Sequence, residues 1–234
     1  MSIIPDKPPF KLLDILYKKE FILLIVLISI LIINSNITPY FLDLYNLIDS
    51  TFLFSEKAII ALTMTFIIIA RHIDLSVASI IAVSSCVLGY TTSLGYDTWM
   101  VLLLTLFSGA LCGAFNGAII TKFAIPSIIV TIGTMSLFRG LAYSFLEHSY
   151  YNKFPKIVSN LGSGYLFGYI PYAFLTFILL ALVFAFILHK TTVGKKIYSI
   201  GNNPDAAQYT GIAADKYTFV LFTLNGLFSA IAAI

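Results

Sequence analysis

The sequence predicts an all-α, polytopic membrane protein with about seven transmembrane helices, a cytoplasmic N-terminus and one discontinuous helix. Three observations support this prediction: 59% of the 234 residues are hydrophobic, only 11% are charged, and the mean hydropathy is +0.95. A soluble domain has roughly 25% charged residues. Because so few charged side chains cannot cover a surface in water, most of this surface must face lipid, where helices satisfy their own backbone polar groups.

Seven apolar segments are candidate spans, since a helix needs about 20 mostly apolar residues to cross the bilayer core. They lie at roughly 20–38, 57–71, 75–91, 99–120, 126–146, 166–188 and 217 onward. No small-residue cleavage site follows the first span, so we expect that span to be retained. We assign residues 1–19 to a cytoplasmic N-terminal segment, residues 20–234 to a transmembrane domain, and residues 189–216 to a cytoplasmic loop within that domain.

The distribution of basic residues predicts the orientation, because lysine and arginine accumulate in cytoplasmic segments. With the N-terminus inside, the cytoplasmic segments contain Lys7, Lys11, Lys18, Lys19, Arg71, Lys122, Lys190, Lys195, Lys196 and Lys216. The external segments contain only Lys57, Lys153 and Lys156. The net charge of +3 is too small to suggest a nucleic-acid partner. We therefore expect the polar stretch 201–212 to lie in the cytoplasm.

The second and third spans are separated by the polar sequence RHIDLS, which contains Arg71, His72, Asp74 and Ser76. Charged residues at membrane depth usually face a cavity or pair with one another, which favours a hinge or pathway element in a discontinuous helix. The alternative is a helix cap at Asp74 beside basic residues that anchor the chain at the inner face. His72 and Asp74 have no recognisable nucleophile with them, so we predict no catalytic site.

The fourth span contains a tandem GxxxG ladder formed by Gly109, Gly113 and Gly117. This spacing places small residues on one helix face, where a neighbouring helix can approach closely, so we expect the ladder to serve helix packing. Asn116 lies beside this face and needs a hydrogen-bond partner, either on another helix or in a polar path. Cys86 and Cys112 lie in apolar runs without the spacing of metal ligands, so we predict no metal site.

The fifth span starts near Pro126, which suits a first helical turn. It then carries a polar stripe, Thr131, Gly133, Thr134 and Ser136. Such a stripe either lines a hydrophilic path or bonds to the carbonyls of its own helix. Arg139 is deeper than an interfacial anchor should be, unless it snorkels or pairs. Tyrosines in the following loop, including Tyr151, form either an interfacial aromatic belt or a surface for an external partner or sugar.

The cytoplasmic stretch GNNPDAAQYTGI, residues 201–212, has the pattern of a short capped helix. Asn202 or Asn203 can cap the helix, and Pro204 and Asp205 suit its first turn. Ala206 and Ala207 favour helix, and Gly211 is placed to end it. About two turns are too few to be stable alone in water, so the membrane surface, the same protein or a partner must hold this helix. The two alanines form a small face that suits another protein's cleft, whereas the alternative is a connector on the bilayer.

These segments together resemble the permease subunits of bacterial ATP-binding-cassette importers. The sequence from Asp205 to Gly211 resembles their cytoplasmic EAA…G coupling motif, with aspartate in place of glutamate. IDLSVAS, GALCGAFNGAII and IPSIIVTIGTMSLFRGLAY resemble elements of the branch that takes up ribose, rhamnose and autoinducer-2. The order and spacing match from about residue 20 to the end, and SEKAIIALTMT, PSIIVTIGTMSLFRG and GNN are most similar to rhamnose permeases.

The resemblance implies a non-enzymatic permease that imports rhamnose or a similar monosaccharide. Its implied partners are a second permease subunit, identical or a sister, two cytoplasmic ATPases that hold ATP and Mg²⁺, a periplasmic or lipid-anchored sugar-binding protein, and membrane lipid. It supports a coupling role for the 203–211 helix. Our own hypotheses are that the break at 71–79 forms part of a gate and that Asn116, Thr131, Thr134 and Ser136 line a polar path. This sequence has no phosphate-binding GxxxxGK[ST] loop, so ATP hydrolysis must come from a partner.

Two features depart from the family pattern. Arg71-His72 replaces a Gly-Gly pair before Ile-Asp-Leu, which we expect to stiffen the break. Family members have about ten spans, so the resemblance implies a chain truncated at its C-terminus. Two alternatives remain: uptake of autoinducer-2 or ribose by the same mechanism, and a stand-alone secondary transporter with Asp74 as its coupling acid. The second alternative leaves the capped cytoplasmic helix unexplained.

Overall fold

The computed structural model describes residues 19–146, 151 and 153–234, so the predicted N-terminal segment lies almost entirely outside the described residues. The chain divides into two compact units, residues 1–48 and 49–234. The elements in chain order are α2 (Lys19–Ile37), α3 (Leu44–Ile69), α4 (Val77–Ser93), α5 (Thr98–Phe123), α6 (Ser127–Leu146), α7 (Lys156–Ser163), β1 (Tyr165–Leu166), β2 (Ile170–Pro171), α8 (Tyr172–Lys190), α9 (Thr192–Asn202), α10 (Pro204–Tyr209) and α11 (Ala214–Ala232).

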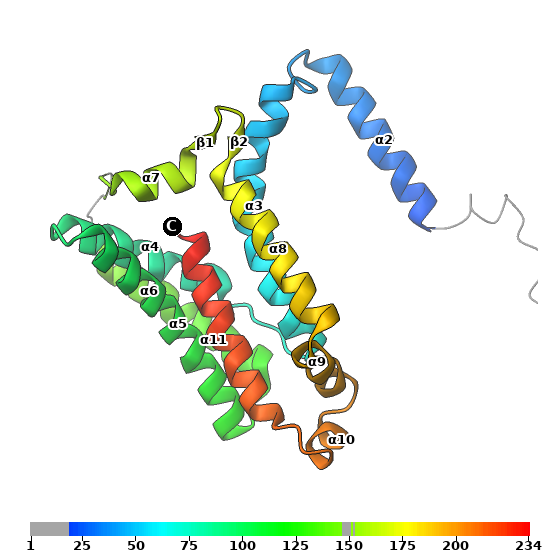
Figure 1. Ribbon diagram of the computed structural model, residues 1–234, viewed down its shortest axis with the longest axis vertical. Helices are drawn as coiled ribbons and strands as arrows, with labels where there is room; N and C mark the ends of the chain where they lie inside the picture. The colour runs from blue at the N-terminus through cyan, green and yellow to red at the C-terminus, as the bar shows by residue number, and fades with distance from the viewer. Residues whose placement is uncertain (1–18, 147–150, 152) are drawn as a thin grey trace, which may run out of the picture. The chain divides into compact units, whose positions relative to one another are not determined.

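Each predicted span corresponds to a helix, and the all-α polytopic fold class is confirmed (Figure 1). Among the described residues, α3, α5, α6 and α8 are long and apolar enough to cross a membrane. Residues 21–37 and α4 form shorter apolar helices. The break between the second and third spans is also present, because residues 70–76 separate α3 from α4 without helical structure.

Two predicted boundaries were wrong because hydropathy does not mark every helix end. α3 begins at Leu44 rather than near residue 57, since its first turns contain polar residues such as Asp49 that an apolar window leaves out. α8 begins at Tyr172 rather than near residue 166, because β1 and β2 form a short antiparallel hairpin there. The hairpin turn places Phe167 and Gly168 at φ values of 54° and 80°.

Local signals set the ends of α5 and α6. The Asp97 carboxylate accepts a hydrogen bond from the Trp99 backbone N–H at 3.1 Å and so caps α5. α5 ends where Ala124 adopts a left-handed φ of 51°. Pro126 then precedes the first residue of α6, and its carbonyl accepts the first helical hydrogen bonds. The two helices are therefore joined by a tight connection on the predicted cytoplasmic side.

The helices α4, α5, α6 and α11 pack side by side in the second unit (Figure 1). The closest contact joins α5 to α11, and the glycine ladder faces it. A Cβ atom on Gly113 would overlap the carbonyl oxygen of Phe222 and lie 3.0 Å from the Gly226 Cα. Gly109 and Gly117 also face α11, next to Gly226 and Phe219 respectively. The ladder thus permits backbone-to-backbone packing, which is what small residues contribute within a membrane.

Candidate functional site

The break after α3 begins with a helix ending of the Schellman type. The Arg71 N–H binds the Ile68 carbonyl and the His72 N–H binds the Ile67 carbonyl, both at 3.0 Å. This pattern places Arg71 in the left-handed position, with a φ of 64°, which glycine usually occupies. The structure therefore explains why a glycine suits this position and why arginine is unusual there.

Replacing Arg71 with glycine should raise the free energy of unfolding by up to about 1 kcal/mol, because a left-handed φ costs a non-glycine residue roughly that much. Thermal unfolding of the purified protein in detergent measures the change. Arg71→Ala is the matched control, since it removes the charge but keeps a Cβ at the strained position. Equal stabilisation by both variants would show that charge, rather than backbone conformation, is responsible.

Asp74 is buried in the break and accepts three hydrogen bonds. Its Oδ1 accepts from the Ser76 backbone N–H at 2.9 Å and from the Ser76 hydroxyl at 2.6 Å, while its Oδ2 accepts from Asn225 Nδ2 at 2.8 Å. Asp74 is not itself the N-cap residue of α4, because Ser76 occupies that position and makes no side-chain cap bond. The carboxylate instead fixes the turn that leads into α4.

Asn225 and Asn116 extend this network to three helices. Asn225, on α11, accepts a hydrogen bond from the Thr63 hydroxyl of α3 at 2.6 Å. Asn116, on α5, donates to the Ser76 hydroxyl at 2.8 Å. All these side chains are buried. We call Thr63, Asp74, Ser76, Asn116 and Asn225 the break network, and it joins α3, the break, α5 and α11.

A second set of contacts holds the break against α6 and α11. The Ile73 N–H donates to the Ser127 hydroxyl at 3.1 Å, and the Thr131 hydroxyl donates to the Ile73 carbonyl at 3.3 Å. His72 Nε2 lies 3.1 Å from the Thr218 hydroxyl of α11. The break is thus supported on several sides, and helix rearrangements around it would have to move these contacts.

The residues predicted to line a path occupy two different environments. Asn116, Thr131 and Thr134 are buried between helices. The Thr134 hydroxyl bonds to the Thr131 carbonyl at 3.4 Å, which is the back-bonding alternative for this stripe. Ser136 instead lies on the exposed face of α6. A path-lining role for these residues stays a prediction, and Ser136 is the one of the four whose side chain is exposed.

The loop at residues 189–216, predicted to be cytoplasmic, contains a helix that was not predicted from the sequence, α9. Thr191 caps it by accepting from the Gly194 N–H. Ile197 and Ile200 are buried in a cluster with residues of α3, including Phe66 and Ile67. The signal that could have revealed α9 is the apolar spacing of Val193, Ile197 and Ile200 after a threonine cap.

Gly201 brings the end of α9 against the end of α3. A Cβ on Gly201 would overlap the Ile69 carbonyl oxygen and lie 2.9 Å from the carbonyl carbon. Ile69 directly precedes the break. Through this glycine, α9 is therefore in backbone contact with the end of α3, directly before the break.

The short helix α10 has the cap and the end that its sequence predicts. Asn203 is the cap, and its Oδ1 accepts from the Ala206 N–H at 3.0 Å. Gly211 has a φ of 84° and ends the helix, with the Ile212 N–H bonded to the Ala207 carbonyl at 3.0 Å. Pro204 occupies the first turn. The same protein holds this helix, which was one of the three supports predicted for it.

The two alanines of α10 do not form one exposed face. Ala207 is buried in the cluster that contains Phe66 and Ile200, whereas Ala206 and Asp205 are exposed. Tyr209 is 92% exposed and was not singled out from the sequence. The exposed residues of α10 therefore include Asp205, Ala206 and Tyr209, together with Pro204 and Gln208, while Ala207 anchors the helix from inside.

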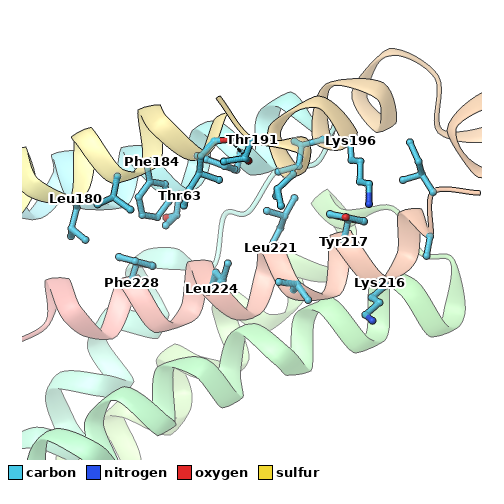
Figure 2. Close-up of a pocket in the computed structure, with 18 of the residues that line it drawn as sticks. Thr63, Leu180, Phe184, Thr191, Lys196, Lys216, Tyr217, Leu221, Leu224 and Phe228 are labelled. Carbon is cyan, nitrogen blue, oxygen red and sulfur yellow. Dashed lines mark hydrogen bonds between the residues drawn. The ribbon is translucent and has the colours of Figure 1, made fainter. Parts of the chain in front are cut away.

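An apolar groove of about 830 Å³ lies between α8 and α9 on one side and α11 on the other (Figure 2). Phe184 and Phe228 lie toward one end, and Lys196 and Tyr217 toward the other. The Lys196 Nζ is 5.6 Å from the centre of the Tyr217 ring, a cation–π contact that holds the lysine at this end. The mostly apolar lining offers few partners for sugar hydroxyls, so we do not assign sugar binding to this groove.

Comparison with known proteins identifies the family. Residues 46–234 match the family described as the permease component of the branched-chain amino acid transport system. The chain belongs to this family. It is a multi-pass protein of the bacterial inner membrane, as predicted from its apolar helices and the family resemblance.

Individual permeases are similar over most of this chain. Ribose import permease protein RbsC of Haemophilus influenzae is 32% identical over 93% of this chain and 67% of its own length. Autoinducer 2 import system permease protein LsrC of Photorhabdus luminescens is 32% identical over 81% of this chain and 58% of its own length. Autoinducer 2 import system permease protein LsrD of Klebsiella pneumoniae is 31% identical over 92% of this chain and 66% of its own length. The chain spans between 58% and 67% of the length of these three permeases, and no solved structure gives a significant match.

Proposed function

We propose that this chain is a permease subunit of an ATP-binding-cassette importer for a monosaccharide or a similarly hydroxyl-rich small molecule. The observation that supports this most strongly is the 31–32% identity to ribose and autoinducer-2 permeases over 81–93% of the chain. Their names favour ribose or autoinducer-2 as the substrate. Rhamnose stays a candidate from sequence resemblance alone.

The proposed partners follow from the same relatives and from the residues of α10. Two permease subunits, identical or sisters, enclose the path, an external sugar-binding protein delivers substrate, and two cytoplasmic ATPases bind ATP and Mg²⁺. Exposed Asp205, Ala206 and Tyr209 dock on an ATPase. The aromatic ring of Tyr209 supplies the kind of rigid, amphipathic anchor that is common at the energetic centre of protein interfaces.

Movement of α10 has a packed route to the break. Ala207 lies in one buried cluster with Ile197 and Ile200 of α9, and this cluster continues to Phe66 of α3 and to Ala70, the first residue of the break. Close-packed protein interiors have low compressibility, so a displacement on one side of such a cluster is transmitted to the other side. We therefore place Arg71, His72, Asp74 and Ser76 in an element that responds when the ATPases close.

The environment of Asp74 favours the importer over a stand-alone secondary transporter. A coupling acid must take up and release a proton during transport, so it needs access to water. Asp74 instead has 3% of its surface exposed and directs both oxygens to donors on Ser76 and Asn225. These contacts give the carboxylate a positioning role.

Changing Tyr209 to alanine should reduce co-purification of the ATPase subunit and ATP-driven sugar uptake by about tenfold or more, because a buried aromatic anchor contributes about 2 kcal/mol to an interface. The measurement uses the complete importer in membrane vesicles. Tyr169→Ala is the matched control, since Tyr169 is 69% exposed in the turn between β1 and β2, on the opposite side of the membrane from α10 in the predicted topology. Undiminished association would exclude α10 as the docking helix, and sugar uptake without any ATPase subunit would overturn the importer assignment itself.

A further inference from the structure

A second pocket, which shares no lining residue with the apolar groove, combines a charged group with aromatic rings. It has a volume of about 630 Å³ and is lined by residues of α4 and α6 together with Tyr151 and Phe154. The residues that give it chemical character are Ser85, Arg139, Tyr143, Tyr151 and Phe154. With the N-terminus inside, this pocket belongs to the outer half of the chain.

Arg139 occupies an exposed position in the C-terminal half of α6, a helix long enough to cross the membrane. An arginine that faces lipid near the centre of a span costs roughly 2.5–3.5 kcal/mol. No ion pair or hydrogen bond joins its side chain to another residue in the part of the chain that the structure describes. A polar surrounding for this guanidinium would remove that cost.

One face of α6, which runs from the middle of the helix to the pocket, carries small and polar residues in place of the large apolar side chains that suit lipid. Gly133, Ser136, Gly140 and Tyr143 recur at helical spacing along one side. A Cβ added to Gly133 or Gly140 would meet no atom within 4 Å, so the space beside both glycines is open. Ser136 is exposed on this face, and Tyr143 is 69% exposed where the face reaches the pocket. A small, polar and open face leads from mid-helix to Arg139.

The aromatic wall of the pocket is built into the packing of α4. The Tyr151 ring lies directly on Gly89, where a Cβ would come within 2.7 Å of the Tyr151 Cδ2. Gly89 therefore makes room for this ring beside the pocket. Phe154 and the ring of Tyr143 supply further apolar surface.

We infer that this pocket is an outer binding site for a polyhydroxylated substrate, a monosaccharide or a diol of similar size. The planar guanidinium of Arg139 offers five N–H donors in a fixed fork, which suits neighbouring hydroxyl oxygens. The tyrosine and phenylalanine rings cover the apolar face of a sugar ring, and the hydroxyls of Ser85 and Tyr143 add polar contacts. The volume lies within the roughly 300–1,000 Å³ of small-molecule sites. This inference rests on the proposed function and names where its substrate first contacts the permease.

The test measures uptake of ribose, rhamnose and autoinducer-2 by the complete importer in vesicles, over a range of substrate concentrations. Arg139→Met and Arg139→Lys should each raise the KM for uptake at least tenfold with a near-normal maximal rate, because lysine lacks the planar fork. Tyr143→Ala should raise the KM more than Tyr143→Phe does. ATPase co-purification and thermal unfolding should match the wild type. Lys153→Met, which removes another positive charge from the predicted outer side, should leave the KM unchanged.

Two results separate the pocket from the proposed function. If the wild-type importer takes up a substrate and the Arg139 and Tyr143 variants have its KM, the pocket assignment is wrong and the importer stands. A reduced maximal rate at unchanged KM likewise contradicts substrate binding and indicates a structural role. If the wild-type complex, with its ATPase bound, takes up none of the three probes, the proposed substrate class fails and the assignment of this pocket fails with it.

Discussion

Replacing Gly113 with leucine should lower the free energy of unfolding by about 3 kcal/mol, the upper end of the usual range for overpacking a tight contact. The added side chain would meet the Phe222 carbonyl oxygen and the Gly226 backbone of α11. Neither is a flexible side-chain end that can move aside cheaply, so the two helices must separate. Thermal or denaturant unfolding in detergent, followed by far-ultraviolet circular dichroism, measures the loss.

Gly133→Leu is the matched control for this experiment. It makes the same substitution within a helix, but the structure has open space around the new side chain. Its stability should stay within about 0.5 kcal/mol of the wild type, as is usual for substitutions away from packed features. Equal losses in the two variants would show that the glycine ladder does not hold α5 against α11 in solution.

The ladder illustrates what could be predicted from sequence and what could not. Regular spacing along one helix is a local pattern, so the close-packed face of Gly109, Gly113 and Gly117 could be predicted directly. The helix that packs there could not, because Phe222 and Gly226 lie far along the chain on α11. Periodicity describes a face and carries no information about the element that covers it.

The break network shows the same limit more sharply. Asp74 and Ser76 were recognised as unusual because they interrupt an apolar run. Asn225, the partner of Asp74, is 151 residues away in the sequence and was missed, although an asparagine within an apolar helix is itself a signal that a buried partner exists. The acceptor, Asp74, could thus be recognised from the sequence, but its donor, Asn225, could not be selected.

The short helix α10 was predicted better because its signals are local. Asn203, Pro204 and Gly211 set the start and end of α10 through backbone preferences, which do not depend on distant contacts. The inward direction of Ala207 was not predictable in this way, since it depends on a buried cluster with α3 and α9. Exposure, and therefore the choice of docking residues, required the tertiary structure.

These two regions together suggest why a polar break is maintained inside an apolar chain. A continuous helix through residues 70–76 would satisfy its own backbone and would have no need of Asp74 or Asn225. The break instead exposes backbone groups at Ile73 and Ser76, and nearby side chains bind them. A segment held by specific side-chain contacts can exchange one set for another, whereas a regular helix has no alternative set to adopt.

Asp74→Leu should therefore be strongly destabilising, by about 3 kcal/mol, because it leaves the buried Ser76 N–H without its acceptor and the Asn225 amide with only the weak Met64 sulfur acceptor at 3.8 Å. Asp74→Asn should cost only about 1 kcal/mol. Its amide oxygen can still accept from Ser76. Asn225 can rotate its amide to accept from the new NH₂ group while donating to the Thr63 hydroxyl, whose proton has a second acceptor in the Ile60 carbonyl 3.0 Å away.

A double-mutant cycle between Asp74→Leu and Asn225→Leu measures the contact itself. If the two side chains act as one unit, the loss of unfolding free energy in the double variant should be smaller than the sum of the two single losses by at least about 1 kcal/mol. Additive losses would mean that the 2.8 Å hydrogen bond contributes little. Uptake by the Asp74→Asn variant then separates the two mechanisms, since an importer driven by ATP keeps working with a neutral side chain there, whereas a transporter coupled through this acid stops.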